Sequence, residues 1–120
     1  TIISSGYCVS ESIKAAELLE KEGISAGVIN MYCWKPIDED LIVKSAKETG
    51  AIVTAENHNC TCGLGSAVAR VLSAKCPTPV EMVGVHDQFG QVGAQSFLQE
   101  AYKLTAEEIV ANVKKVIARK

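Results

Sequence analysis

The sequence predicts an α/β fold, a single domain over residues 1–120 built on a mostly parallel β-sheet. Two observations carry this prediction. Short apolar runs rich in β-branched residues alternate with helical patterns along the whole chain, which is typical of βαβ units. The runs do not alternate polar with apolar residues, as expected of strands that helices cover on both faces. With 120 residues, 48% of them hydrophobic, the chain is long enough for one core and too short for two.

The expected strands cover residues 1–4, 26–31, 51–56 and 80–85. Crossovers between parallel strands are right-handed, which leaves few arrangements for these elements. If the first two crossovers leave in opposite directions, the sheet reverses between the first and third strands. The crevice at the carboxyl ends of those strands is then the natural position for a ligand. The loops at that point are residues 5–10 and 57–65.

Five helices are expected, each between residues that start or stop a helix. Ser10 can cap the first, and Gly23 supplies the left-handed residue that ends it. Thr105 and Glu108 form a T-x-x-E capping box for the last, which continues with apolar residues along one face. The five helices cover residues 11–22, 38–49, about 65–76, 95–103 and the segment after Thr105.

Composition excludes several classes of protein. The net charge of −2 gives no basic footprint for a nucleic acid or an anionic membrane, and no apolar run approaches the roughly 20 residues that span a bilayer. The chain opens directly on an apolar strand without Met, so we expect a domain of a longer protein. Five cysteines at irregular spacing fit free thiols in a reducing compartment, and hence the cytoplasm: Cys8, Cys33, Cys60, Cys62 and Cys76.

The densest polar cluster lies in residues 56–65, between the third strand and the next helix. A glycine-rich turn that leads into a helix can present backbone N–H groups to a phosphate or a carboxylate. Gly63 and Gly65, with Ser5 and Gly6 in the neighbouring loop, are therefore candidates for an anion site. The alternative, which we favour, is that the glycines allow close packing of helix on strand.

Glu56 and His58 are two residues apart on an extended segment, so their side chains lie on the same side and can form an acid–base pair. The alternative is that Glu56 accepts hydrogen bonds from loop amides and His58 makes a packing hydrogen bond. We favour the alternative because no nucleophile or second carboxylate accompanies the pair. His86 and Asp87 follow the fourth strand, where turn formation and helix capping suffice to explain them. The sequence therefore indicates no catalytic residue.

His58, Cys60 and Cys62 form an H-x-C-x-C pattern, and the topology is expected to bring Cys8 and Cys33 to the same edge of the sheet. Such a group can hold a soft metal ion. The C-x-C spacing matches zinc knuckles poorly, so we favour small buried thiols and no metal.

Tyr32 and Trp34 follow the second strand. Aromatic residues in a surface loop can anchor a partner, or the loop can close over the core of its own domain.

Five segments together carry a resemblance to a known family. They are Ala15-Ala16-Glu17-Leu18-Leu19-Glu20-Lys21-Glu22-Gly23-Ile24, Lys35-Pro36-Ile37-Asp38, Glu56-Asn57-His58 with Cys62-Gly63-Leu64-Gly65-Ser66, Asp87-Gln88-Phe89-Gly90, and Tyr102-Lys103-Leu104-Thr105. In their order and spacing they resemble the C-terminal domain shared by transketolases, deoxyxylulose-phosphate synthase and the β subunits of 2-oxoacid dehydrogenases. Asn57 stands where the family often has an acidic residue, and Cys62 where a glycine is common.

The resemblance implies a three-layer α/β/α domain with a mixed sheet, in which a further antiparallel edge strand precedes Thr1. It implies a parent enzyme that binds thiamine diphosphate and Mg²⁺ between two other domains and transfers a two-carbon ketol unit between sugar phosphates, as in the pentose phosphate pathway. This domain would be a non-catalytic assembly domain without a cofactor of its own. Its partners would be the pyrimidine- and diphosphate-binding domains, in a homodimer. The alternatives are the equivalent domain of the synthase or dehydrogenase, and a regulatory module that binds a phosphorylated metabolite.

Overall fold

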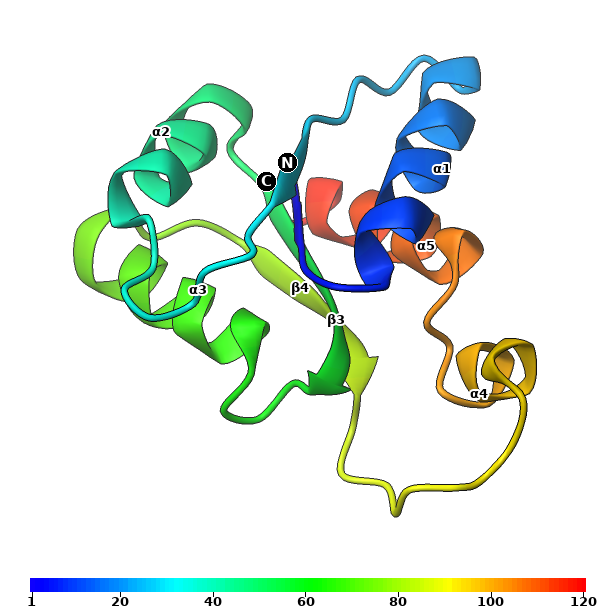
Figure 1. Ribbon diagram of the computed structural model, residues 1–120. Helices are drawn as coiled ribbons and strands as arrows, with labels where there is room; N and C mark the ends of the chain where they lie inside the picture. Colours follow the sequence, from blue (N-terminus) through cyan, green and yellow to red (C-terminus); the bar gives the residue numbers. More distant parts are fainter.

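The computed structural model describes residues 1–120 and contains a four-stranded β-sheet (Figure 1). The strands lie in the order β2-β1-β3-β4, and every pairing is parallel. The predicted α/β fold is thus confirmed, and within these residues the sheet is wholly parallel. The antiparallel strand implied by the resemblance was expected before Thr1, outside the described chain. The strands are β1 (Ile2–Ser4), β2 (Val28–Asn30), β3 (Ile52–Asn59) and β4 (Val80–Val85).

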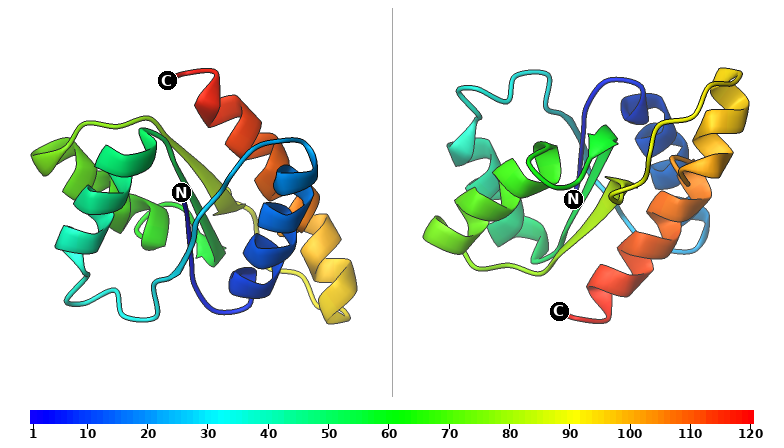
Figure 2. Two further views of the ribbon diagram at one scale, coloured as in Figure 1. Left: turned by 90° about the horizontal axis from the view of Figure 1, so that it is seen from above. Right: turned by 90° about the horizontal axis from the view of Figure 1, so that it is seen from below.

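Helices form a layer on each face of the sheet (Figure 2). One layer contains α1 (Cys8–Lys21) and α5 (Ala106–Ile117), and the other contains α2 (Glu39–Thr49) and α3 (Leu64–Lys75). The short helix α4 (Gln95–Ala101) lies beyond the N-terminal end of α5 and beyond the carboxyl ends of the strands. The three layers agree with the predicted architecture. No helix combines the length and the hydropathy that a membrane span requires.

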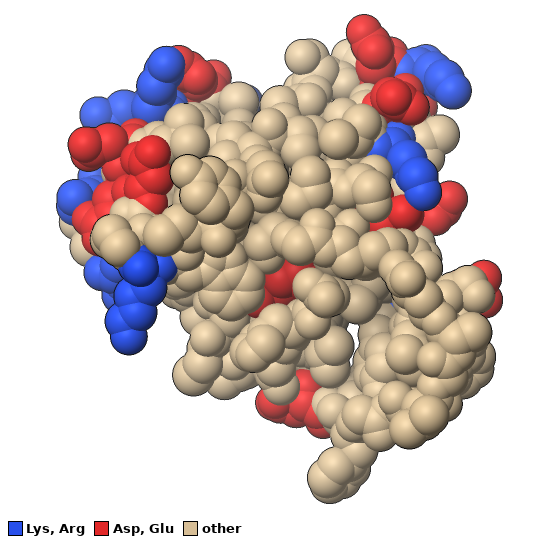
Figure 3. Space-filling view, viewed as in Figure 1, with Lys and Arg blue, Asp and Glu red and all other residues tan.

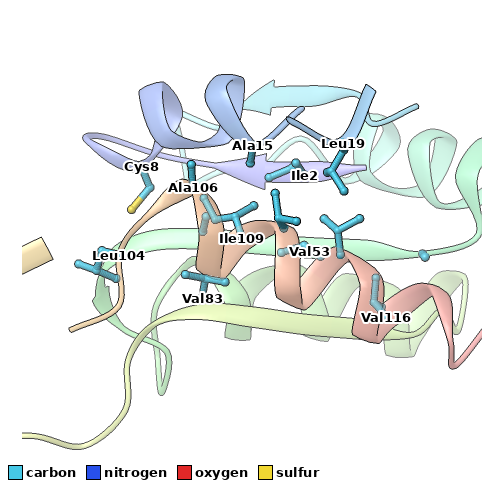
Figure 4. Close-up of a cluster of buried hydrophobic side chains, with 14 residues drawn as sticks. Ile2, Cys8, Ala15, Leu19, Val53, Val83, Leu104, Ala106, Ile109 and Val116 are labelled. Carbon is cyan, nitrogen blue, oxygen red and sulfur yellow. The ribbon is translucent and has the colours of Figure 1, made fainter. Parts of the chain in front are cut away.

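Each helical layer encloses its own apolar cluster. Between the sheet and the α1–α5 layer, Ile2, Val53 and Ile109 are almost completely buried, and Figure 4 shows how their side chains converge. On the other face, Ile52 and Leu72 belong to the cluster under α2 and α3. A fully buried side chain of this size contributes roughly 1.5–3 kcal/mol, so the two clusters fix both helical layers on the sheet.

The start of α1 differs from the prediction. The helix begins at Cys8, and the side-chain hydroxyl of Ser10, inside its first turn, donates to the carbonyl oxygen of Tyr7 over 3.0 Å. Ser10 is therefore not the cap, because the helix already starts from the turn at Gly6, whose carbonyl accepts from the amide of Val9 over 3.2 Å.

The capping box of α5 is half formed. The hydroxyl of Thr105 accepts from the amide of Glu108 over 3.3 Å, but the Glu108 carboxylate turns to Asn112. Instead, the Glu11 carboxylate on α1 accepts from the amide of Ala106 over 3.0 Å. A buried carboxylate from a distant helix thus completes the cap.

Candidate functional site

The carboxyl ends of the strands bring four loops to one edge of the sheet, as predicted. β1 lies between β2 and β3, with the first two crossover helices, α1 and α2, on opposite faces. The loop after β1 touches the last residues of β3, since a Cβ atom added to Gly6 would lie 3.0 Å from Oδ1 of Asn57. Gly6 itself has a φ of 55°, a conformation that favours glycine. The expected switch point is therefore present at this edge.

Glu56 occupies the N-terminus of α3. Its carboxylate is fully buried and accepts from the amide of Leu64 over 2.6 Å and from the amide of Gly65 over 2.8 Å. The sequence analysis considered these backbone amides as donors to a bound phosphate or carboxylate. In the structure they donate to the Glu56 carboxylate of the protein itself. Burial raises the pKa of Glu56, although the two amides and His58 act in the opposite direction.

Close packing around the N-terminus of α3 explains the two glycines of the turn, Gly63 and Gly65. A Cβ atom on Gly63 would overlap Oε2 of Glu56 and the carbonyl oxygen of Asn59. A Cβ atom on Gly65 would lie 2.7 Å from Sδ of Met82. Both positions therefore need glycine for close packing of α3 on β3 and β4.

His58 lies at the surface beside Glu56 without a hydrogen bond to it. Its Nδ1 is 4.0 Å from Oε2 of Glu56 and 2.9 Å from the carbonyl oxygen of Asn59. A hydrogen bond between a nitrogen and an oxygen atom spans about 2.7–3.2 Å, so the structure holds the two side chains on the same side but without a direct hydrogen bond. The ring of His58 packs edge-on against Trp34, with ring centroids 6.1 Å apart.

The cysteines are dispersed. Cys60 is buried, and burial together with Glu56 raises its pKa to about 11. Cys62 is exposed with a φ of 66°. Cys8 lies in the apolar cluster below α1, where burial and the nearby carboxylates raise its pKa to about 12. Cys33 is exposed in the loop after β2.

No group of three or more His, Cys, Asp or Glu side chains lies together so that it could hold a metal ion. His58, Cys60 and Cys62 are therefore not brought together as a metal site. The same observation shows that the side chains of this chain do not fit the Mg²⁺ ion of a thiamine diphosphate enzyme. The buried carboxylate at the switch point, Glu56, accepts hydrogen bonds from two amides instead.

The two aromatic residues after β2 have different roles. The ring nitrogen of Trp34 donates to the carbonyl oxygen of Met31 over 3.0 Å, and the side chain packs on the core under α2 and α3. Tyr32 is 88% exposed. One residue closes the loop over its own domain, and the other remains available at the surface.

The structure adds a feature that the sequence analysis missed, an extended arm formed by residues 88–99. Phe89 and Val92 are fully exposed, Phe97 is half exposed, and α4 buries no residue. The arm leaves the sheet after β4 and carries α4 away from the body of the domain (Figure 1). Its flanking residues Asp87 and Lys103 have φ values of 47° and 55°.

The arm also carries no charge. Between Asp87 and Glu100 no Lys, Arg, Asp or Glu occurs, although 22% of the chain is charged. Figure 3 shows the charged atoms gathered mainly over the opposite end of the molecule, whereas the surface of the arm is almost entirely uncharged. A long stretch without charged residues is the signal in the sequence that would have indicated this surface.

Comparison with known proteins assigns the fold to a family. A sequence model described as "Transketolase, C-terminal domain" matches residues 1–109. This chain belongs to the transketolase C-terminal domain family. The resemblance of its five segments to that family is thereby confirmed.

The relatives that match the chain are transketolases and a related synthase. A 6-deoxy-6-sulfo-D-fructose transketolase subunit of Clostridium sp. (strain MSTE9) is 48% identical over all of this chain and 37% of the subunit. The 1-deoxy-D-xylulose-5-phosphate synthase of Heliobacterium modesticaldum is 43% identical over 91% of this chain and 17% of that enzyme. The chain therefore spans well under half the length of these relatives.

A solved structure agrees with the fold. A split gene transketolase, in an inactive beta4 tetramer, matches with a TM-score of 0.94 and 49% identity over 98% of this chain and 38% of that chain. The arm, the two helical layers and the parallel sheet thus belong to a fold that a transketolase chain also contains.

Proposed function

We propose that this chain is the assembly domain of a longer, thiamine-diphosphate-dependent transketolase that transfers a two-carbon ketol unit between sugar phosphates. The observation that carries the proposal is the arm, which exposes Phe89 and Val92 and has no charged residue. The cores of protein interfaces are depleted in charge and enriched in aromatic side chains. An exposed apolar surface of this kind indicates a contact with another domain or subunit.

The parent enzyme in this proposal is divided between two polypeptides. The Clostridium relative is a transketolase subunit, and the solved relative is a split gene transketolase. This chain corresponds to a little over a third of each of them. Relatives that are 1-deoxy-D-xylulose-5-phosphate synthases share less of their length with it. The sequence identities, 48% and 49% to the two transketolases and 43% to the synthase, favour the split transketolase over the synthase.

Cofactor and partners follow from the same proposal. Thiamine diphosphate and Mg²⁺ would bind in the pyrimidine- and diphosphate-binding domains, which would contact the arm, and the enzyme would act as a dimer in the cytoplasm. Glu56 and His58 at the switch point do not form a hydrogen-bonded acid–base pair. A regulatory anion site at α3 is not proposed, since Glu56 already uses those amides.

The test is made in the full-length enzyme with its partner subunit. In the arm variant, Phe89 and Val92 are both replaced by Ser, and Ile13→Ser on α1 is the matched control because Ile13 is also an exposed apolar residue, 49% exposed. Sedimentation velocity measures the assembly, and turnover is measured with thiamine diphosphate, Mg²⁺ and sugar phosphates.

We expect the arm variant to sediment as smaller species and to lose turnover in proportion, while Ile13→Ser retains both. Circular dichroism confirms that each variant keeps its fold. Unchanged assembly and turnover in the arm variant would refute the proposal, as would turnover by this chain without the rest of the enzyme.

A further inference from the structure

The inner side of the arm borders an open cavity at the switch point. The cavity has a volume of about 470 Å³ and lies between the arm with α4 on one side and the loop after β1 and the ends of β3 and β4 on the other. Figure 3 shows the hollow between the lobe of α4 and the body of the molecule. Tyr7 and Asn57 line it from the body, and Leu98 and Tyr102 from α4 and its end. Its size falls in the range of about 300–1,000 Å³ found for small-molecule sites.

All the glutamines of the chain line this cavity. The sequence contains four, and each of them contributes to the lining, together with Asn57: Gln88, Gln91, Gln95 and Gln99. The hydrogen bonds in this part of the protein come from His58, Asn59 and the hydroxyl of Tyr102, and none involves these five side-chain amides. Each amide therefore offers free donors and a free acceptor.

The cavity contains no charge and its wall is held in place. None of its twelve lining residues is Lys, Arg, His, Asp or Glu. The hydroxyl of Tyr102 donates to the carbonyl oxygen of Phe89 over 2.8 Å. The ring of Phe97 packs against Gly93, where a Cβ atom would lie 2.7 Å from Cδ1 of the ring. The amides are thus presented on a defined wall rather than on a loose loop.

The two sides of the arm differ in chemistry. Phe89, Val92 and Phe97 do not line the cavity, whereas the glutamines do. The outer side therefore serves the proposed assembly, and the inner side remains available to a ligand.

From this arrangement we propose that the cavity binds an uncharged, polyhydroxylated small molecule, a sugar or polyol without a phosphate group. Hydroxyl groups donate and accept hydrogen bonds, as the amides do, and Val85 and Leu98 offer apolar contact to the C–H groups of such a ligand. A phosphate or sulfonate would leave its charge without a cation, which is costly in a partly enclosed site. The proposal does not rest on the assembly role.

The probe is ribitol, compared with ribitol 5-phosphate. The experiment uses the full-length enzyme, in which single substitutions identify the side-chain NH₂ signals of this chain's four glutamines in a ¹⁵N–¹H correlation spectrum. We expect ribitol to shift these signals saturably with a Kd of about 1 mM or somewhat above, which corresponds to about −4 kcal/mol. Ribitol 5-phosphate is expected to bind at least roughly tenfold more weakly.

The variant test replaces Gln91 and Gln95 together by Leu, which keeps the size of the side chains and removes their amides. Ribitol affinity should fall roughly tenfold or more. Asn30→Leu is the matched control, because Asn30 is an exposed amide outside the cavity, and this variant should bind ribitol normally. The arm variant with Ser at Phe89 and Val92 should also bind ribitol normally, which separates this inference from the assembly role.

Three results would overturn the inference. The first is the absence of a saturable shift of the glutamine signals with ribitol well above millimolar concentration. The second is equal or tighter binding of ribitol 5-phosphate. The third is a combination of two observations: the variant with Leu at Gln91 and Gln95 loses subunit assembly, and the original protein does not bind ribitol. Together they would mean that a segment of the partner subunit fills the cavity.

Discussion

Replacing Glu56 by Gln tests the contact that fixes α3 to β3. Both carboxylate oxygens accept from amides, over 2.6 Å from Leu64 and 2.8 Å from Gly65. A glutamine keeps one acceptor and places an NH₂ group against the other amide. One buried N–H group then has no acceptor, which costs about 1–3 kcal/mol. The removal of a buried charge offsets part of this cost, so we expect a net loss of about 1–2 kcal/mol.

Urea unfolding of the protein measures this loss. A destabilisation of that size lowers the midpoint by roughly 1 M for a protein with an m value of about 1–2 kcal/mol/M. Hydrogen exchange at the amides of Leu64 and Gly65 should also become faster. Glu39→Gln is the matched control, since Glu39 stands at the start of α2 but is held at the surface by Arg70 and Lys75, and its effect should be smaller.

The pH dependence provides a further check on Glu56. Because its pKa is raised in the folded protein, folding takes up a proton there, and this contribution to stability is lost as pH rises through the folded pKa. The variant lacks the contribution, so the loss of stability in Glu56→Gln should be larger at about pH 5 than at about pH 8. A variant as stable as the original protein, with unchanged amide exchange, would refute the reasoning.

Three other changes have defined expectations. Gly63→Ala should lower the urea midpoint because its Cβ would overlap the Glu56 carboxylate, whereas Gly27→Ala, with no atom within 4 Å of the added Cβ, should leave the midpoint unchanged or raise it slightly. Thr54→Val should raise the thermal midpoint, since the buried Thr54 hydroxyl has no hydrogen-bond partner; a lower midpoint would show that the hydroxyl does have one. Burial alone would raise the pKa of Glu11, but hydrogen bonds, chiefly from Lys14, lower it. Its contribution to stability is present above the unfolded pKa and is lost as pH falls through the folded pKa. The free energy of unfolding should therefore fall less steeply with pH below about pH 4.5 in Glu11→Gln than in the original protein. An unchanged slope in this pH range would contradict the assignment.

The layered fold was predictable because its signals are local. The apolar runs that became β1 and β4 are short and β-branched, and the helix after Thr105 combines a cap with apolar residues at helical spacing. Physical reasoning on neighbours in the sequence was sufficient for these elements. The close packing at Gly63 and Gly65 also followed from their position between a strand and a helix.

The remaining features depend on contacts between distant residues. The start of α5 uses a carboxylate of Glu11, which no local pattern connects to Ala106. β3 runs to Asn59 rather than ending at residue 56, because its last residue pairs with Val85 beyond a register shift. A helix was expected over residues 95–103, which overlaps the arm, and only the structure shows that this helix, α4, buries no residue.

The cap that Glu11 provides for α5 has a consequence for the order of folding during synthesis. The amide of Ala106 and the Glu11 side chain are separated by 95 residues, so the Glu11 carboxylate receives this hydrogen bond only after nearly the whole chain has left the ribosome, whereas the Thr105 hydroxyl can cap the helix locally. Glu56 and Leu64 are 8 residues apart, and their contact can form as soon as that segment emerges. Since domains are synthesised from the N-terminus and contacts distant in sequence form slowly, the layer of α2 and α3 can pack on the sheet while α1 still awaits its partner helix.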